Sequence, residues 1–280
     1  MTTKIPFVCV NDSYWKVQKT APNSNPKQQR KRGCMKKVWV WFILIALAIA
    51  ATTAEADMAA ALKAAGKQNK HLFALFVRQG DPQGETMKIV FAEAERTLGK
   101  RALFRTAKVT DLAEVDFVSK YGIDRAPMPL TLVFAPNGAI VNSFPGKVVT
   151  KDELGNAFAA PAFADVMKAL QDGKVVLLCV QGKRTQHNGP SLAAARSAAY
   201  DQRAKGTIAV VQAAPEDAVN ANMLKPLKAD SNLKVATVFI LVPPSTLAGK
   251  VEGATTHEDL WTAITKGVSA CSGSSGCCPK

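Results

Sequence analysis

The chain has few residues of the kinds that carry catalysis. Its only histidines, His71, His187 and His257, are far apart in the sequence. It contains no Gly-x-Ser-x-Gly nucleophile motif, no phosphate-binding glycine loop and no His-Glu-x-x-His zinc motif. Hydrolase, nucleotide-binding and metalloprotease chemistry therefore have no residue constellation in their favour. We interpret each histidine as a solvated or capping residue.

Aromatic residues are also scarce, at 7% of the chain, although the formal net charge is +14. Half of that positive excess lies in residues 1–56, which hold nine Lys or Arg and two acidic residues. In the rest of the chain the basic side chains are spread out and rarely accompanied by aromatic ones. A nucleic-acid groove needs clustered basic and stacking side chains, so no nucleic-acid partner is expected.

Residues 35–56 have the order of an export signal. Two lysines precede an apolar run of 14 residues, Val38 to Ala51, and small residues then lead to Ala56 at the spacing that a signal peptidase reads. Cleavage after Ala56 would make Asp57 the first residue of an exported protein, periplasmic or associated with the cell envelope. The alternative is an uncleaved anchor, which would be the only contact of the protein with the membrane.

Residues 1–34 fit neither a signal nor an anchor. They are rich in Asn, Gln, Pro and Lys, and Met35 would be a natural start for the signal. The segment is therefore either a basic cytosolic tail or the product of a start codon assigned too early.

A β-hairpin is the clearest local signal in the remaining chain. The apolar run Leu130–Phe134 is followed by an Asn-Gly turn at Asn137 and then by a second short apolar run, Ala139–Val141. Pro129 stands directly before the first strand. Because proline cannot donate a hydrogen bond to a sheet, it belongs at the first position of a strand or in a tight turn.

The same order of predicted elements occurs twice, in residues 57–165 and in residues 166–268. In each segment a strand, a loop, a helix and a second strand are followed by a helical stretch, a hairpin and a last helix. The first strands are predicted at His71–Val77 and Lys174–Val180. A repeat of about 100 residues is too long for a solenoid and indicates two copies of one α/β domain.

The pattern from Tyr121 to Gly146 resembles the C-terminal half of a thioredoxin fold, and Pro129 stands where that family has its cis-proline. The resemblance implies two tandem thioredoxin-like domains, each a mixed central sheet flanked by helices. In the second domain, Ala236 takes the position of Pro129, so the resemblance is weaker there.

The two loops that would carry the Cys-x-x-Cys motif of thioredoxins, residues 78–84 and 181–190, contain no cysteine. Dithiol exchange at these positions is therefore not expected. The organisation is similar to that of the redox-silent domains of disulfide isomerases, which bind unfolded peptides or partner proteins. That similarity implies a binding module without a cofactor, whose partner is an envelope protein or an unfolded peptide. It also implies a binding surface formed by Pro129, Met128, Gly80, Asp81 and Pro82.

Three cysteines, Cys271, Cys277 and Cys278, lie in the Gly- and Ser-rich tail, residues 269–280, which is predicted to be flexible. They fit a disulfide or a tether to a partner, a soft-metal site, or an idle tail. The alternative function is therefore a thiol-disulfide oxidoreductase or a soft-metal-binding protein that uses this tail. Cys179 lies within an apolar strand and is expected to be buried.

Overall fold

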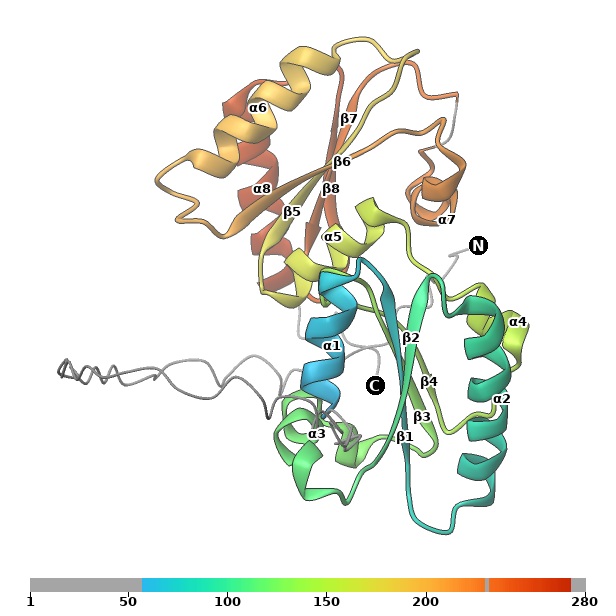
Figure 1. The fold of residues 1–280 in the computed structure, drawn as a ribbon. Coiled ribbons are helices and arrows are strands. Elements are labelled where there is room, and N and C mark those ends of the chain that lie inside the picture. The colour runs from blue at the N-terminus through green and yellow to red at the C-terminus, as the bar shows by residue number, and fades with distance from the viewer. Residues whose placement is uncertain (1–56, 230–231, 273–280) are drawn as a thin grey trace, which may run out of the picture.

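The computed structural model describes residues 57–229 and 232–272, and side chains up to residue 267. It shows two units of the same architecture, each a four-stranded sheet with helices on both faces (Figure 1). No helix in these residues is long and apolar enough to cross a membrane. The predicted fold class, α/β with two tandem thioredoxin-like domains, is confirmed.

The first unit has the sheet order β2-β1-β3-β4, in which β1 and β2 are parallel and the other neighbouring strands are antiparallel. The predicted hairpin of β3 and β4 is present. The elements of this unit are α1 (Met58–Lys67), β1 (His71–Val77), α2 (Pro82–Leu98), β2 (Ala102–Lys108), α3 (Val115–Tyr121), β3 (Leu130–Phe134), β4 (Ile140–Pro145) and α4 (Lys151–Gly155).

The second unit repeats this topology with the sheet order β6-β5-β7-β8. Again the first two strands of the unit, β5 and β6, are parallel, and the hairpin of β7 and β8 is antiparallel to β5. Its elements are α5 (Pro161–Gln171), β5 (Val175–Val180), α6 (Asn188–Tyr200), β6 (Ile208–Ala213), α7 (Ala221–Leu224), β7 (Thr237–Val242), β8 (Thr246–Glu252) and α8 (His257–Ser272).

Each sheet separates two apolar layers. In the first unit, α1 and α3 pack on one face of the sheet, whereas α2 and α4 pack on the other. In the second unit, α5 and α7 share one face, whereas α6 and α8 cover the other. The central strands β1 and β5 are covered on both faces, which explains why they are continuous apolar runs rather than alternating ones.

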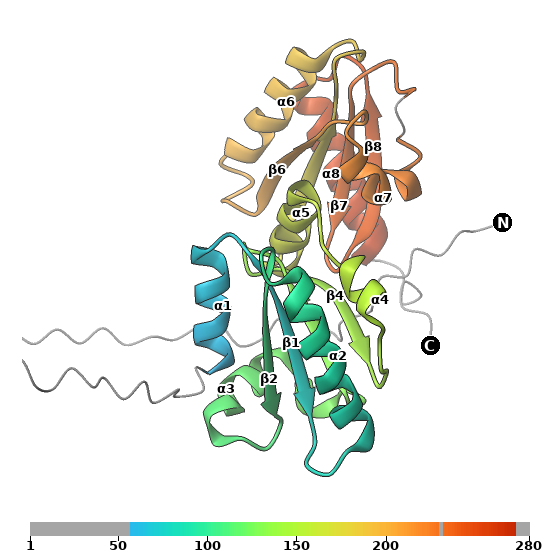
Figure 2. The same cartoon turned by 45° about the vertical axis from the view of Figure 1, so that its right-hand side comes forward.

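Helix α5 lies between the two sheets and joins the units (Figure 2). Its apolar face packs into the core of the second unit. At its C-terminal end, the side chain of Gln171 accepts a hydrogen bond from the Ile140 N–H (3.0 Å) and donates one to the Ile140 carbonyl (2.7 Å). In the middle of the helix, Asp165 accepts a hydrogen bond from Asn137 (2.9 Å). Helix α5 therefore packs in the core of the second unit and also forms hydrogen bonds with the outer edge of β4.

This packing moves the junction between the units. The sequence placed it at residues 165/166, which is inside α5. The apolar residues of α5 pack into the core of the second sheet, so the junction lies between α4 and α5. Two other boundaries also differ. The residue pattern predicts a strand over Leu233–Val242 and a last helix over His257–Lys266. In the structure, β7 begins at Thr237 and α8 continues to Ser272.

Candidate functional site

Pro129 and the loop before α2 lie at the same end of the first sheet. Phe76 in β1 pairs with Leu130 in β3, so the residue after Phe76 is level with Pro129. The loop of residues 78–81 leaves β1 at that point and enters α2. We call Gly80, Asp81, Pro82, Met128 and Pro129 the Pro129 surface. The register therefore brings the five predicted binding residues to one end of the sheet.

The start of α2 gives one side of this surface a defined backbone. Asp81 is the N-cap residue, and its carboxylate accepts a hydrogen bond from the Gln83 N–H (3.0 Å). Pro82 follows at the first helical position, where its missing N–H costs no helical hydrogen bond. Gly80 has a φ of +75°, a left-handed conformation that glycine adopts without strain. Gly80 and Pro82 are exposed, so this turn is open to a partner.

The other side is the segment 127–129, held in place by Gly146. The Met128–Pro129 peptide bond is cis, as the resemblance implied. The Gly146 N–H donates to the carbonyls of both Pro127 (3.1 Å) and Pro129 (2.9 Å). A Cβ at Gly146 would lie 2.9 Å from the Pro127 side chain. Sequence reasoning missed this supporting role, although glycine after Pro145 is the signal for a tight turn.

The equivalent place in the second unit is filled by the chain itself. Here the loop after β5 folds onto the segment before β7. The Gln186 N–H donates to the Lys234 carbonyl (2.9 Å), and the Ala236 N–H donates to the Gln186 carbonyl (2.8 Å). In the first unit, Pro129 replaces Ala236 and has no N–H to donate. Among the described residues, no hydrogen bond joins residues 78–82 to residues 127–129.

The loop after β5 is further closed by its own side chains. Thr185 and Asn188 both donate hydrogen bonds to the Gly182 carbonyl, at 2.9 Å and 2.8 Å. Glu216 accepts a hydrogen bond from the Lys183 N–H (2.8 Å). This bond is the main reason that the pKa of the Glu216 carboxyl is below its usual range. The two units therefore differ in backbone hydrogen bonding at this position, which Gln186 closes in the second unit and no described residue closes in the first.

Cys179, the one cysteine whose side chain the structure describes, lies in the second unit and away from the Pro129 surface. Cys179 is buried in β5, and burial raises the pKa of its thiol to about 12, so it is not a reactive thiolate at neutral pH. The backbone of Cys271 lies in the last turn of α8, whereas the sequence predicted a flexible segment there. Cys277, Cys278 and the predicted cleavage residue Ala56 lie outside the described residues. No group of three metal-ligating side chains occurs within residues 57–229 and 232–267.

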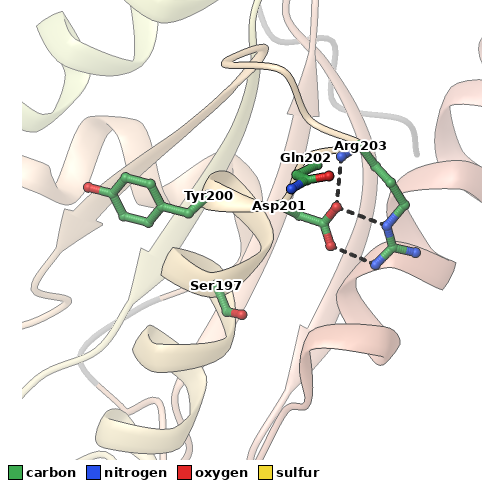
Figure 3. A pocket seen from close by; sticks show the side chains of 5 residues that line it. All are labelled: Ser197, Tyr200, Asp201, Gln202 and Arg203. Carbon is green, nitrogen blue, oxygen red and sulfur yellow. Dashed lines mark hydrogen bonds and ion pairs between the residues drawn. The ribbon is translucent and has the colours of Figure 1, made fainter.

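A hollow of about 530 Å³ lies at the end of α6 and is lined by residues between Ser197 and Arg203 (Figure 3). The side chain of Asp201 accepts hydrogen bonds from the Arg203 guanidinium, at 2.8 Å and 3.0 Å. These bonds hold the pKa of the Asp201 carboxyl well below its usual range. Tyr200 is 89% exposed and points away from the pair.

The same pair connects α6 to the start of α8. The Asp201 carboxylate lies 3.0 Å from Nε2 of His257, and the Arg203 guanidinium lies 4.4 Å from the centre of the Trp261 ring. The indole N–H of Trp261 also approaches Nε2 of His257, at 2.8 Å. Since the charged groups are engaged with one another, we interpret this cluster as a connection between the helices and not as a catalytic site.

The topology of each unit, with a parallel strand pair extended by an antiparallel hairpin, is that of the thioredoxin fold. Similar solved structures are thioredoxin-fold proteins. The first two thioredoxin domains of Saccharomyces cerevisiae Eps1p are 12% identical, with a TM-score of 0.28, and the match covers 71% of this chain and 92% of that chain. Human ERp44 is 10% identical, with a TM-score of 0.31, and the match covers 75% and 55%. Plasmodium falciparum thioredoxin is 18% identical, with a TM-score of 0.29, and the match covers 35% and 89%. No protein-family model and no curated protein matches the chain.

Proposed function

We propose that this protein is an exported binding module without enzymatic chemistry of its own, and that the Pro129 surface binds extended segments of unfolded or partner polypeptides. The observation that carries the proposal is the contrast between the units. In the second unit, backbone hydrogen bonds to Gln186 close the position. In the first unit no hydrogen bond among the described residues closes the same position, where Pro129 is buried beside the exposed residues Gly80 and Pro82. Residues 78–84 also contain no thiol that could perform exchange.

The composition of the surface supports binding of polypeptide. Met128 is half-buried and packs against the core of the first unit, so part of its flexible thioether side chain remains available to a ligand. Arg78 and Gln79, in the loop that leads to α2 at the same end of the sheet, are exposed. An adaptable apolar side chain next to polar groups suits segments of varied sequence, which is what a partner of unfolded chains requires.

Replacing Met128 by Lys should weaken the binding of a permanently unfolded probe, a reduced and carboxymethylated polypeptide labelled with a fluorophore. We expect a loss of about tenfold in affinity, since a charge would replace the apolar contact at the centre of the surface. Fluorescence anisotropy titration of the chain from Asp57 onward would measure it.

The matched control is Ile89→Lys, which makes the same chemical change at a residue of α2 that is 64% exposed. The control should bind the probe as the unchanged protein does. Equal affinities for Met128→Lys and the unchanged protein, with both folded by circular dichroism, would contradict the proposal. Circular dichroism is needed because Met128 also contacts the core.

Export is part of the proposal and is tested by the intact mass of the protein purified from the cell envelope. We expect a mass that begins at Asp57. Thiol counting on the same sample, before and after reduction, tests the alternative function. In that alternative, thiol-disulfide exchange or soft-metal binding depends on Cys271, Cys277 and Cys278. A mass that includes residues 1–56 would contradict cleavage and favour the anchored form.

A further inference from the structure

The second sheet has a free edge at β6. In the described residues β6 pairs only with β5, so one side of the strand has no partner. The carbonyls of Thr207 and Ala213 accept hydrogen bonds from the β5 side. Because backbone groups alternate in direction along a strand, the N–H and C=O groups of Ile208, Val210 and Gln212 point to the free edge. A row of backbone donors and acceptors is therefore available to an added strand.

The corresponding edge of the first unit is protected. Strand β2 occupies the same place in its sheet and carries two exposed charged side chains, Arg105 and Lys108. Charged side chains on an edge strand oppose pairing with another strand. Strand β6 has the sequence Ile-Ala-Val-Val-Gln-Ala and no charge, so this protection is missing there.

A groove of about 690 Å³ runs beside this edge. Six consecutive residues, 209–214, form its floor, and its walls come from the first residues of α5 and from the segment after β6. Val219 lines the groove and is 59% exposed, so its apolar side chain is accessible to a ligand there. The groove thus offers apolar contact beside most of the free edge, from residue 209 to the end of β6.

The walls of the groove also carry two carboxylates, Asp165 and Asp217. Asp165 accepts a hydrogen bond from Asn137, and Asp217 accepts one from the Val219 N–H (3.2 Å). Within the described part of the chain, neither forms an ion pair with Lys, Arg or His. The groove therefore combines apolar side chains with two carboxylates that lack a basic partner, and it matches a ligand that combines apolar residues with Lys or Arg.

We propose that β6 binds an extended segment of another polypeptide by strand addition, and that this segment has small apolar residues flanked by Lys or Arg. Main-chain hydrogen bonds to Val210 and Gln212 would provide the pairing, and the groove would select the side chains. A second copy of this chain fits less well, because edge-to-edge pairing of two β6 strands would bring the carboxylates of both copies together. This site is separate from the Pro129 surface and does not depend on it.

The test uses the chain from Asp57 onward and an acetylated, amidated heptapeptide, Lys-Val-Ala-Val-Ala-Val-Lys. Amide hydrogen exchange followed by NMR should show that the peptide protects the amides of Val210 and Gln212. The amides of Ala209 and Val211 point to β5 and should be protected with or without the peptide. A peptide with Glu at both ends should bind about tenfold more weakly or worse.

Gln212→Pro removes one outward N–H and leaves the bonds to β5 in place, so it should lower the affinity for the heptapeptide by about tenfold or more. Thr106→Pro is the matched control. Thr106 holds the equivalent outward position in β2, since the Arg101 carbonyl and the Val109 N–H bond to β1. This control should bind the heptapeptide unchanged.

Three outcomes would overturn the proposal. One is the absence of any protection by the peptide, and another is equal affinity in Gln212→Pro and the unchanged protein. The third is protection of Val210 and Gln212 without peptide in a protein that sediments as a dimer, which would make the edge an interface between copies. None of these results bears on Met128→Lys, so failure here is distinguishable from failure of the proposed function.

Discussion

Replacing Phe134 by Ala should lower the free energy of unfolding of the first unit by about 3–5 kcal/mol. Phe134 is fully buried in β3, and its ring packs edge-on against Phe117 and Tyr121, with centroid distances of 5.8 Å and 5.4 Å. The surrounding strands and helices fix its cavity from both sides, so the site cannot collapse around the smaller side chain. The loss therefore includes a cavity term in addition to the lost apolar burial.

Urea unfolding of the chain from Asp57 onward, followed by far-ultraviolet circular dichroism, would measure this loss. Trp261 is the only tryptophan in that chain and reports on the second unit separately. Leu112→Ala is the control, because Leu112 is 88% exposed and its truncation should change the free energy by less than about 0.5 kcal/mol. A midpoint for Phe134→Ala that matches this control would show that the aromatic cluster does not stabilise the unit.

Lowering the pH from about 6.5 to 4 should also destabilise the protein, through His71. The imidazole is half-buried at the start of β1, and Nε2 accepts a hydrogen bond from the Ala159 N–H (3.3 Å) in the segment between the units. Its ring contacts Phe158, which also lies under the guanidinium of Arg101. Burial, with a smaller contribution from the charge of Arg101, lowers the pKa of His71 to about 4.

The direction of the effect follows from this lowered pKa. The unfolded chain binds the proton at a pKa near 6.5, whereas the folded protein binds it only near 4. The contribution of His71 to stability is therefore complete above about pH 6.5 and is lost as the pH falls toward 4. The free energy of unfolding should therefore fall by about 1–2 kcal/mol. This is less than the full pKa difference would give, because the ring is partly exposed to solvent.

Thermal unfolding at several pH values between 4 and 7 would measure this contribution. In His71→Gln, the decline in melting temperature across this interval should be smaller than in the unchanged protein. His187→Gln is the control, because that imidazole is exposed and the decline should persist. If the melting temperatures of His71→Gln and the unchanged protein decline in parallel, His71 is not the titrating group.

Because Ala159 lies between the units, protonation of His71 should also loosen the connection to α5.

Much of the fold follows from the sequence, because its signals are local. The apolar runs of β1 and β5, the Asn-Gly turn of the hairpin and the repeated order of elements all depend on neighbouring residues. The resemblance around Pro129 rests on residue types at short offsets. The boundaries that differ at α5 and β7 are those at which contact with a distant segment decides where an element begins or to which unit it belongs.

The sequence by itself determined two α/β units, the residues that meet at the end of the first sheet, and the lack of cysteine in either loop. Only the tertiary structure decided that backbone hydrogen bonds to Gln186 close this position in the second unit and that no described residue closes it in the first. It also decided that β6 keeps a free, uncharged edge beside a groove. Both properties depend on hydrogen bonds and packing between residues far apart in the chain, and no local pattern of residue types specifies which backbone groups remain unpaired.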